Sequence, residues 1–324
     1  MKVLITGGAG YIGSHVAIKF LKENCQVSII DNLENGRKSL VPNEAELIIA
    51  NITDEEKISK IIQRKHFDIV IHLAAYTKVG ESTENPKKYY ENNYENAKKF
   101  FYICVKNKLK NFIFSSTGSV YGNSSNKNFL ENDKVDPINP YSDSKLKTEN
   151  FLKDISEKKN LKCISLRYFN VAGSDLELKS GLISNPDNLI KALCEYILGK
   201  RKNFFINGND YNTKDGTTVR DFIHVSDLAD IHFLMTKKLL SLADNYYDLY
   251  NCGYGQGFSI LQIIKEFEKI IGKKISYKFG NRRQGDAEIS VANVEKLTNE
   301  FQWKPKFKDL KVILETALNW EKKL

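Results

Sequence analysis

The sequence predicts an α/β protein with a doubly wound parallel sheet and a smaller C-terminal α/β domain. Short runs rich in Ile, Val and Phe alternate with helical patterns through the first half of the 324-residue chain. Such alternation is typical of a parallel sheet covered by helices on both faces. A glycine-rich segment, Gly7–Gly13, directly follows the first apolar run. Because crossovers between parallel strands are right-handed, the sheet should extend in both directions from its first strand.

The strands and helices of this sheet are expected in a regular order. Apolar runs predict strands at Lys2–Ile5, Gln26–Ile30, Glu46–Ile49, Asp68–His72, Asn111–Ser115 and Cys163–Arg167. Helical patterns predict helices at Tyr11–Glu23, at Pro86–Lys106 and at Tyr141–Glu157. A further helix is predicted to begin after a cap at Thr53 or Asp54. Proline is tolerated at the start of a helix, where its missing N–H has no partner to lose.

The pattern becomes less regular after Asn170. Residues 171–181 and 207–216 are rich in Gly, Asn, Asp and Ser, which indicates loops. Helices are expected at Asp187–Leu198, Ser226–Leu239, Ser259–Ile271 and Leu310–Trp320. We therefore predict a nucleotide-binding domain of residues 1–170, to which about 218–252 return, and a second domain formed by 171–217 and 253–324.

Composition and charge argue against several classes of protein. No apolar run approaches the ~20 residues of a membrane span, and the run after Met1 is shorter than the about 7–15 residues of a signal peptide core. A cytoplasmic protein without membrane contact is therefore expected. The five cysteines stand singly, which argues against a metal site. The net charge of +9 comes from lysines spread along the chain, so a solvated surface is favoured over nucleic-acid binding.

The glycine-rich segment points to a dinucleotide. Gly7, Gly10 and Gly13 lie between a predicted strand and a predicted helix, where glycine permits a tight turn and a close approach of phosphate to the helix N-terminus. Asp31 follows near the ~20-residue offset of a ribose-binding acid. Such an acid repels a 2′-phosphate, so NAD is favoured over NADP. The competing interpretation is a structural turn with a helix-capping aspartate.

A tyrosine and a lysine form a candidate catalytic pair. Tyr141 and Lys145 are four residues apart on a predicted helix, so their side chains share a face. A neighbouring ammonium and a nicotinamide cation would stabilise the phenolate, which could move a proton while a hydride passes to NAD. Alone, this spacing is usually a surface coincidence. The segments Ser115–Gly122 and Arg167–Asn170 favour a site, because strands end there and C-terminal strand ends form the ligand crevice.

From Met1 to about Trp320 the chain resembles the UDP-glucose 4-epimerases, which belong to the extended short-chain dehydrogenase/reductase family with its Rossmann fold. The resemblance is carried by TGGAGYIGSH (6–15), DNLENG (31–36), VGESTENPKKYYENN (79–93), NFIFSSTGSVYG (111–122), NPYSDSK (139–145), LRYFNVAG (166–173), DGTTVRDFIHVSDLAD (215–230) and RRQGD (282–286). It implies NAD as cofactor, a UDP-sugar as substrate, and a homodimer formed through the helices at 86–106 and 141–157.

The resemblance also implies roles for individual residues. Tyr141, Lys145 and Thr117 would be catalytic, with Tyr141 as the acid/base and Thr117 sharing the 4-hydroxyl of the sugar. The residues implied to contact NAD are Gly7, Gly10, Tyr11, Ile12, Gly13, Asp31, Asn32, Leu33, Asn35, Gly36, Asn51, Ile52, Leu73, Ala74, Ala75, Thr77, Asn92, Tyr141, Lys145 and Phe169. Those implied to hold the substrate are Thr117, Tyr141, Asn170, Asn188, Leu189, Arg220, Arg283, Asp286 and Ser290.

Some positions depart from the pattern of these enzymes. Asn51 stands where an acid is usual, and Thr77 replaces a frequent lysine. Asn207 and Phe222 replace an aromatic residue and a tyrosine near the uracil. Ser290, four residues after Asp286, stands where a tyrosine restricts the space near the sugar C2 in relatives. We hypothesise that this serine admits N-acetylated UDP-sugars; the alternative is a strand serine whose space its neighbours fill.

Other functions compete with the epimerase hypothesis. A 4,6-dehydratase needs an acid pair directly after the threonine, where this chain has Gly118 and Ser119. A C4 ketoreductase needs an exchangeable cofactor. A non-catalytic dinucleotide sensor or an RNA-binding relative would tend to lose the Tyr141–Lys145 pair, which this chain retains.

Overall fold

A seven-stranded parallel sheet forms the larger part of the computed structural model, which describes residues 1–123, 128–183, 188–243 and 245–324. Its strands lie in the order β10-β6-β5-β4-β1-β2-β3. The chain thus winds outward from β1 in both directions, which confirms the predicted doubly wound fold. The strands are β1 (Lys2–Thr6), β2 (Gln26–Asp31), β3 (Glu46–Ile49), β4 (Ile69–His72), β5 (Asn111–Thr117), β6 (Lys162–Tyr168) and β10 (Tyr246–Cys252).

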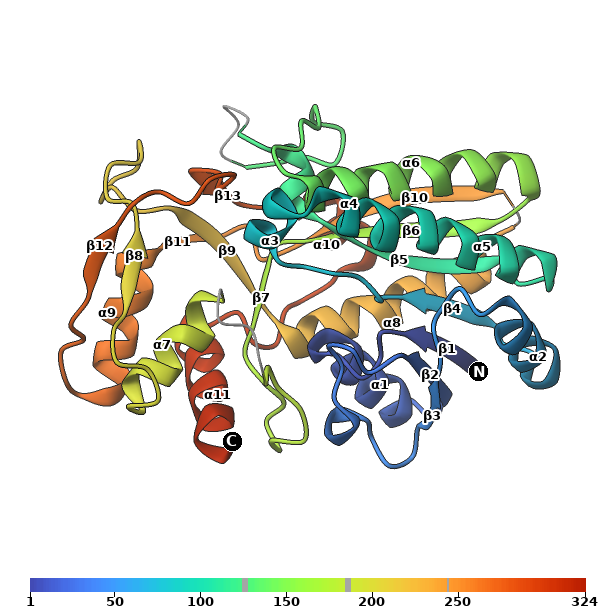
Figure 1. Ribbon diagram of the computed structural model, residues 1–324, viewed down its shortest axis with the longest axis horizontal. Helices are drawn as coiled ribbons and strands as arrows, with labels where there is room; N and C mark the ends of the chain where they lie inside the picture. The colour runs from blue at the N-terminus through green and yellow to red at the C-terminus, as the bar shows by residue number, and fades with distance from the viewer. Residues whose placement is uncertain (124–127, 184–187, 244) are drawn as a thin grey trace.

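Helices cover both faces of this sheet (Figure 1). On one face, α1 (Tyr11–Lys22) packs against α8 (Val225–Ser241). On the other face lie α2 (Glu55–Lys65), α5 (Ala97–Lys106) and α6 (Pro140–Lys159). Successive residues of a strand point to opposite faces, so Val3 and Ile5 join one hydrophobic cluster and Leu4 joins the other. Burial on both faces explains why the central strands are largely apolar.

The helix predicted over 86–106 is interrupted in its middle. It consists of α4 (Pro86–Tyr90), a π-helical segment η2 (Glu91–Asn96) and α5. Within the segment, the Asn93 carbonyl accepts a hydrogen bond from Thr148 of α6 at 3.0 Å, and the Asn93 side chain binds the backbone of Tyr76. These tertiary contacts compete with the regular helical ladder, and the sequence periodicity does not show them.

Short strands and helices form the C-terminal part of the structure. The predicted helices there correspond to α7 (Leu189–Ile197), α8, α9 (Ile260–Ile271) and α11 (Leu310–Lys323); the predicted start of the first, Asp187, lies outside the described residues. Several elements were not predicted from the sequence. Besides β10, they are α3 (Val79–Glu84), α10 (Glu295–Phe301), the short strands β7 (Asn170–Ala172), β8 (Phe205–Asn207), β9 (Val219–His224), β11 (Gly257–Ser259), β12 (Lys278–Gly280) and β13 (Ile289–Ser290), and the 3₁₀ turns η1 (Lys38–Leu40) and η3 (Gly118–Tyr121). Strand β9 pairs with β7, β11 and β13, so these strands depend on distant partners.

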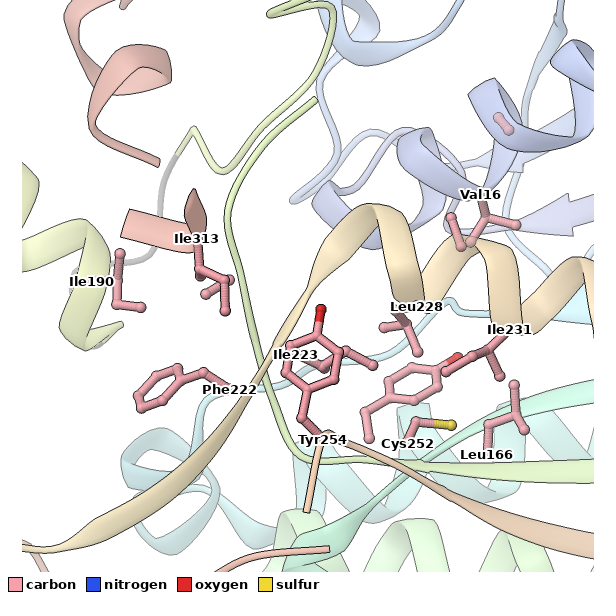
Figure 2. Packing of buried hydrophobic residues seen from close by; sticks show 14 of the residues in the cluster. Val16, Leu166, Ile190, Phe222, Ile223, Leu228, Ile231, Cys252, Tyr254 and Ile313 are labelled. Atoms are coloured by element: carbon pink, nitrogen blue, oxygen red, sulfur yellow. The ribbon is translucent and has the colours of Figure 1, made fainter. Parts of the chain in front are cut away.

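One hydrophobic cluster joins the sheet to this C-terminal part (Figure 2). It contains Val16 of α1 and Leu228 of α8, and it continues through Phe222 of β9 to Ile190 of α7 and Ile313 of α11. The division into two domains stays a prediction, because residues of both predicted domains share this core. Among the described residues, no helix combines the length and the apolar character needed to cross a bilayer.

Candidate active site

The turn between β1 and α1 leaves the helix N-terminus accessible to an anion. Gly7 has φ +71°, and a Cβ there would lie 2.7 Å from the backbone nitrogen of Ala74. A Cβ on Gly13 would lie 2.3 Å from the carbonyl oxygen of Gly7. Gly10 is the N-cap, and no side chain caps the helix. The partial positive charge of the helix N-terminus therefore faces a turn composed mostly of glycine, which suits the pyrophosphate of a dinucleotide.

A cavity of about 470 Å³ begins at this turn and follows the carboxyl ends of the strands. It is lined by all but one of the residues implied to bind NAD, namely Gly7, Gly10, Tyr11, Ile12, Gly13, Asp31, Asn32, Asn35, Gly36, Asn51, Ile52, Leu73, Ala74, Ala75, Thr77, Asn92, Tyr141, Lys145 and Phe169. The exception is Leu33, which does not line the cavity. Its φ of +61° and its N–H, which donates to Asp31 at 2.8 Å, make it a turn residue.

Asp31 connects two sides of this cavity. Its carboxylate accepts hydrogen bonds from the N–H of Ala9 at 3.0 Å and from the N–H of Leu33 at 2.8 Å. Burial raises the pKa of this carboxyl, and the two backbone hydrogen bonds lower it. Asp31 caps no helix, because it is the last residue of β2. It therefore holds the glycine turn while it lines the cavity where a ribose would lie.

A second cavity, of about 520 Å³, adjoins the first and is lined by the C-terminal part of the chain. Its lining contains Asn170, Asn188, Leu189, Arg220, Arg283, Asp286 and Ser290, which are the predicted substrate residues other than Thr117 and Tyr141. Thr117 and Tyr141 line the first cavity. The departures noted at Asn207 and Phe222 also lie in the second cavity.

Basic side chains predominate among the charged residues of the second cavity, and Arg220 and Arg283 are the two predicted to bind the substrate. The Nε of Arg283 lies 3.3 Å from the carboxylate of Asp286, yet it makes no hydrogen bond with any described residue. Burial lowers the pKa of Arg220, and the charge of Asp286 raises it. Arg283 therefore pairs with Asp286, whose charge also acts on Arg220, and the buried Nε–H of Arg283 has no hydrogen-bond acceptor among the described residues. A diphosphate would supply the missing acceptors.

The two cavities meet at the end of β5. They share Thr77, Val79, Gly118, Ser119, Asn170, Asn188 and Ser290. Thr117 and Tyr141 lie next to this junction on the side of the first cavity. A substrate anchored by the arginines can therefore place its far end beside Tyr141 and beside a nucleotide in the first cavity.

Helix α6 positions the tyrosine and the lysine. It begins at Asn139, whose side chain accepts a hydrogen bond from the N–H of Ser142 at 2.9 Å. Burial raises the pKa of Tyr141 to about 12, whereas its hydrogen bond with Thr117 lowers it. Burial is thus the larger effect on this pKa, and the lowering comes from Thr117 rather than from the neighbouring ammonium that the sequence predicts. The phenolate therefore needs further positive charge, which the nicotinamide cation of NAD would supply.

Lys145 lies in an unusually apolar position for a lysine. It is 2% exposed, and its Nζ donates to the carbonyl oxygen of Ser115 at 2.8 Å. The same nitrogen lies 5.0 Å from the centre of the Phe114 ring. Burial lowers the pKa of Lys145 to about 7, and the charge of Glu149 raises it. The protonation of Lys145 thus depends on Glu149, one helical turn further along α6.

A buried ion pair that was not predicted from the sequence lies beneath this site. The Glu149 carboxylate accepts two hydrogen bonds from Arg167 of β6, at 3.0 and 2.7 Å, and one from Ser116. Glu149 is 2% exposed and Arg167 is 4% exposed. Arg167 also donates to the hydroxyl of Tyr121 at 2.9 Å. The four-residue spacing of Tyr141, Lys145 and Glu149, which puts all three on one helix face, could have indicated Glu149 from the sequence.

The comparisons with known proteins agree with this geometry. A model of the NAD dependent epimerase/dehydratase family matches residues 3–253. The UDP-glucose 4-epimerase of Azospirillum brasilense is 38% identical over 324 residues, which are 100% of this chain and 92% of that protein. The structure of the UDP-glucose 4-epimerase from Stenotrophomonas maltophila, with bound NAD and formylated UDP-arabinopyranose, has a TM-score of 0.95 and 31% identity, and covers 100% of this chain and 98% of its own.

A relative with a broader substrate name is also similar. The UDP-Glc/GlcNAc 4-epimerase from Campylobacter jejuni is 37% identical, with a TM-score of 0.85 and coverage of 100% of this chain and 99% of its own. The family match includes more than half of the chain, and the relatives extend over its whole length. The chain therefore belongs to the NAD-dependent epimerase/dehydratase family.

Proposed function

We propose that this protein is a UDP-glucose 4-epimerase, which interconverts UDP-glucose and UDP-galactose. The observation that carries the proposal is the junction of the two cavities. Tyr141 and Thr117 line the first cavity, which contains the glycine turn, and this cavity adjoins a second one whose lining includes Arg220 and Arg283. The relatives named UDP-glucose 4-epimerase support the choice of reaction and substrate.

The proposed mechanism divides the work between the chain and its cofactor. Bound NAD would accept the hydride from C4 of the sugar and return it to the opposite face. Tyr141, as phenolate, takes the proton of the 4-hydroxyl and later returns it, with Thr117 hydrogen-bonded to the same oxygen. Arg220 and Arg283 hold the diphosphate, so the oxidised sugar can rotate and present its opposite face to the cofactor without leaving the site. Because oxidation and reduction cancel, no cofactor is consumed.

The reaction can be tested without added cofactor. We expect the purified protein, supplied only with UDP-galactose, to form UDP-glucose with no net production of NADH, because the hydride returns to the substrate. Product identification by chromatography measures this. A C4 ketoreductase would require added NAD(P)H and release a different product, and a dinucleotide sensor would leave the sugar unchanged. Either result would reject the proposal.

A dehydratase is disfavoured by the packing around Gly118. A Cβ at this position would lie 2.9 Å from the ring of Phe169, so an acidic side chain could be placed there only if that ring moved. Ser119, which lines both cavities, carries no carboxylate. The acid pair needed to eliminate water across C5–C6 of the sugar is therefore missing at both positions.

We also propose that Ser290 makes room for an N-acetyl group on the sugar. Ser290 lies in β13, is partly exposed and lines both cavities. A small side chain at this junction leaves space beside the sugar. We expect measurable turnover of UDP-N-acetylgalactosamine. Ser290→Tyr should lower kcat/KM for this substrate at least about tenfold by steric exclusion, with little change for UDP-galactose.

Ser290→Ala is the matched control for the steric argument. It removes the hydroxyl but adds no volume, so both substrates should be turned over as by the unchanged protein. If the unchanged protein leaves UDP-N-acetylgalactosamine untouched, or if Ser290→Tyr affects both substrates equally, the assignment of Ser290 to substrate selection is wrong.

The predicted homodimer and cytoplasmic location remain part of the proposal. Tyr102 of α5 is 50% exposed and packs edge-to-face on Phe151 of α6 at 5.3 Å, so these helices present an aromatic surface. A dimer through this surface should appear as twice the monomer mass in analytical ultracentrifugation.

All five cysteines are buried and unpaired, which is typical of a reducing compartment and supports the proposed cytoplasmic location.

A further inference from the structure

A hydrogen bond joins the two loops that flank the glycine turn. In the sheet, β1 lies between β4 and β2, so the loops that follow β4 and β2 flank the turn that follows β1. The hydroxyl of Tyr76, after β4, donates to the carboxylate of Glu34, after β2, at 2.7 Å. Both side chains line the cavity that begins at the turn. This hydrogen bond therefore connects the two walls of the nucleotide groove.

The tyrosine is held firmly on its side of the groove. The side chain of Asn93, which is 1% exposed, accepts from the N–H of Tyr76 at 2.9 Å and donates to its carbonyl oxygen at 3.0 Å. The ring of Tyr76 packs against that of Tyr89 at 5.8 Å, and the Nζ of Lys88 lies 4.2 Å from its centre. These contacts fix both the backbone and the ring of Tyr76.

The glutamate comes from a shaped turn but has an exposed side chain. Asp31 accepts from the N–H of Leu33 at 2.8 Å, and Asn32 accepts from the N–H of Glu34 at 3.1 Å, so the backbone of the turn is fixed. The Glu34 side chain is solvent-exposed and can rotate away from Tyr76 without disturbing the core. Glu34 is thus the movable half of the contact.

We propose that the Tyr76–Glu34 hydrogen bond is a clasp that closes over NAD in the groove and slows its release. The pyrophosphate site at the glycine turn lies between the two loops, so an intact hydrogen bond between them would hinder the exit of a bound dinucleotide. Burial first, and then Glu34, raises the pKa of Tyr76 to about 12, so the phenol keeps its donor proton at neutral pH. The proposal depends on NAD as the cofactor and is independent of which sugar is the substrate.

The release rate of NAD tests the clasp directly. The protein is loaded with NAD, freed of excess, and mixed with alcohol dehydrogenase and ethanol, which convert each released NAD to NADH. We expect Tyr76→Phe to accelerate release about fivefold to tenfold, because one hydrogen bond to a carboxylate is lost. Glu34→Ala should have the same effect, and the double variant should be no faster than either single variant.

A matched control separates the clasp from the general loss of a tyrosine hydroxyl. The hydroxyl of Tyr246 donates to the carboxylate of Asp248 at 3.0 Å at the beginning of β10, the end of the strand remote from the cavity. Tyr246→Phe should leave the release rate unchanged. Unchanged release in Tyr76→Phe, or additive effects in the double variant, would overturn the clasp. The assay contains no sugar, so either outcome is separate from the fate of the epimerase proposal.

Discussion

Replacing Tyr141 by phenylalanine should lower kcat with UDP-galactose about a thousandfold, as expected when a general acid/base is removed. The ring keeps its place at the cavity junction, but the group that exchanges a proton with the 4-hydroxyl is gone. Thr117 alone, with an ordinary hydroxyl, is a far weaker base. Initial rates at saturating substrate measure the effect, with the NAD content of both proteins determined in parallel.

The control for this variant is Tyr246→Phe, which removes a tyrosine hydroxyl remote from both cavities and should retain normal turnover. The Tyr141→Phe protein should also bind NAD and UDP as before, since the lost hydroxyl is a small part of either site. Normal turnover by Tyr141→Phe would show that another group moves the proton, and the catalytic assignment would then be wrong.

Glu149→Ala should lower the free energy of unfolding by about 3–5 kcal/mol, because it leaves a buried guanidinium without its partner. Arg167 is 4% exposed and would lose both hydrogen bonds to the carboxylate. Urea denaturation followed by circular dichroism measures the loss. Glu56→Ala, which breaks an exposed pair with Lys60, should change the stability by less than about 1 kcal/mol. Equal losses in the two variants would contradict the role of burial.

Glu149→Gln keeps the shape of the side chain and tests its charge. The Glu149 charge raises the pKa of Lys145, which burial has lowered to about 7. Without that charge the pKa of Lys145 falls further, so the ammonium is lost at a lower pH. The alkaline limb of the pH profile of kcat should therefore move to lower pH. An unchanged profile would show that Glu149 acts on structure alone.

Local sequence patterns were sufficient to predict most of the main sheet and the candidate catalytic pair. Gly7 and Gly13 have no room for a Cβ because of close backbone contacts, and the motif that contains them indicates such contacts directly. The position of Tyr141 relative to Lys145 follows from the helical repeat and was predictable without any tertiary contact. The apolar runs predicted six of the seven strands of the sheet, since burial on both faces requires apolar residues throughout.

Local sequence patterns could not predict contacts between segments that are distant in the sequence. Leu33, predicted to contact NAD, shapes a turn through its hydrogen bond to Asp31, and its contact with the cofactor stays a prediction. The Arg167–Glu149 pair and the Tyr76–Glu34 clasp each join residues from different elements.

The sequence by itself determined the doubly wound sheet, the dinucleotide motif and the tyrosine–lysine pair, because neighbours along the chain specify each of them. Only the tertiary structure decided the C-terminal strands, the π-helical segment at Asn93, the junction at Ser290 and the clasp over the NAD groove. Their partners lie far apart in the sequence, and the free energy of those contacts appears only when the chain has folded.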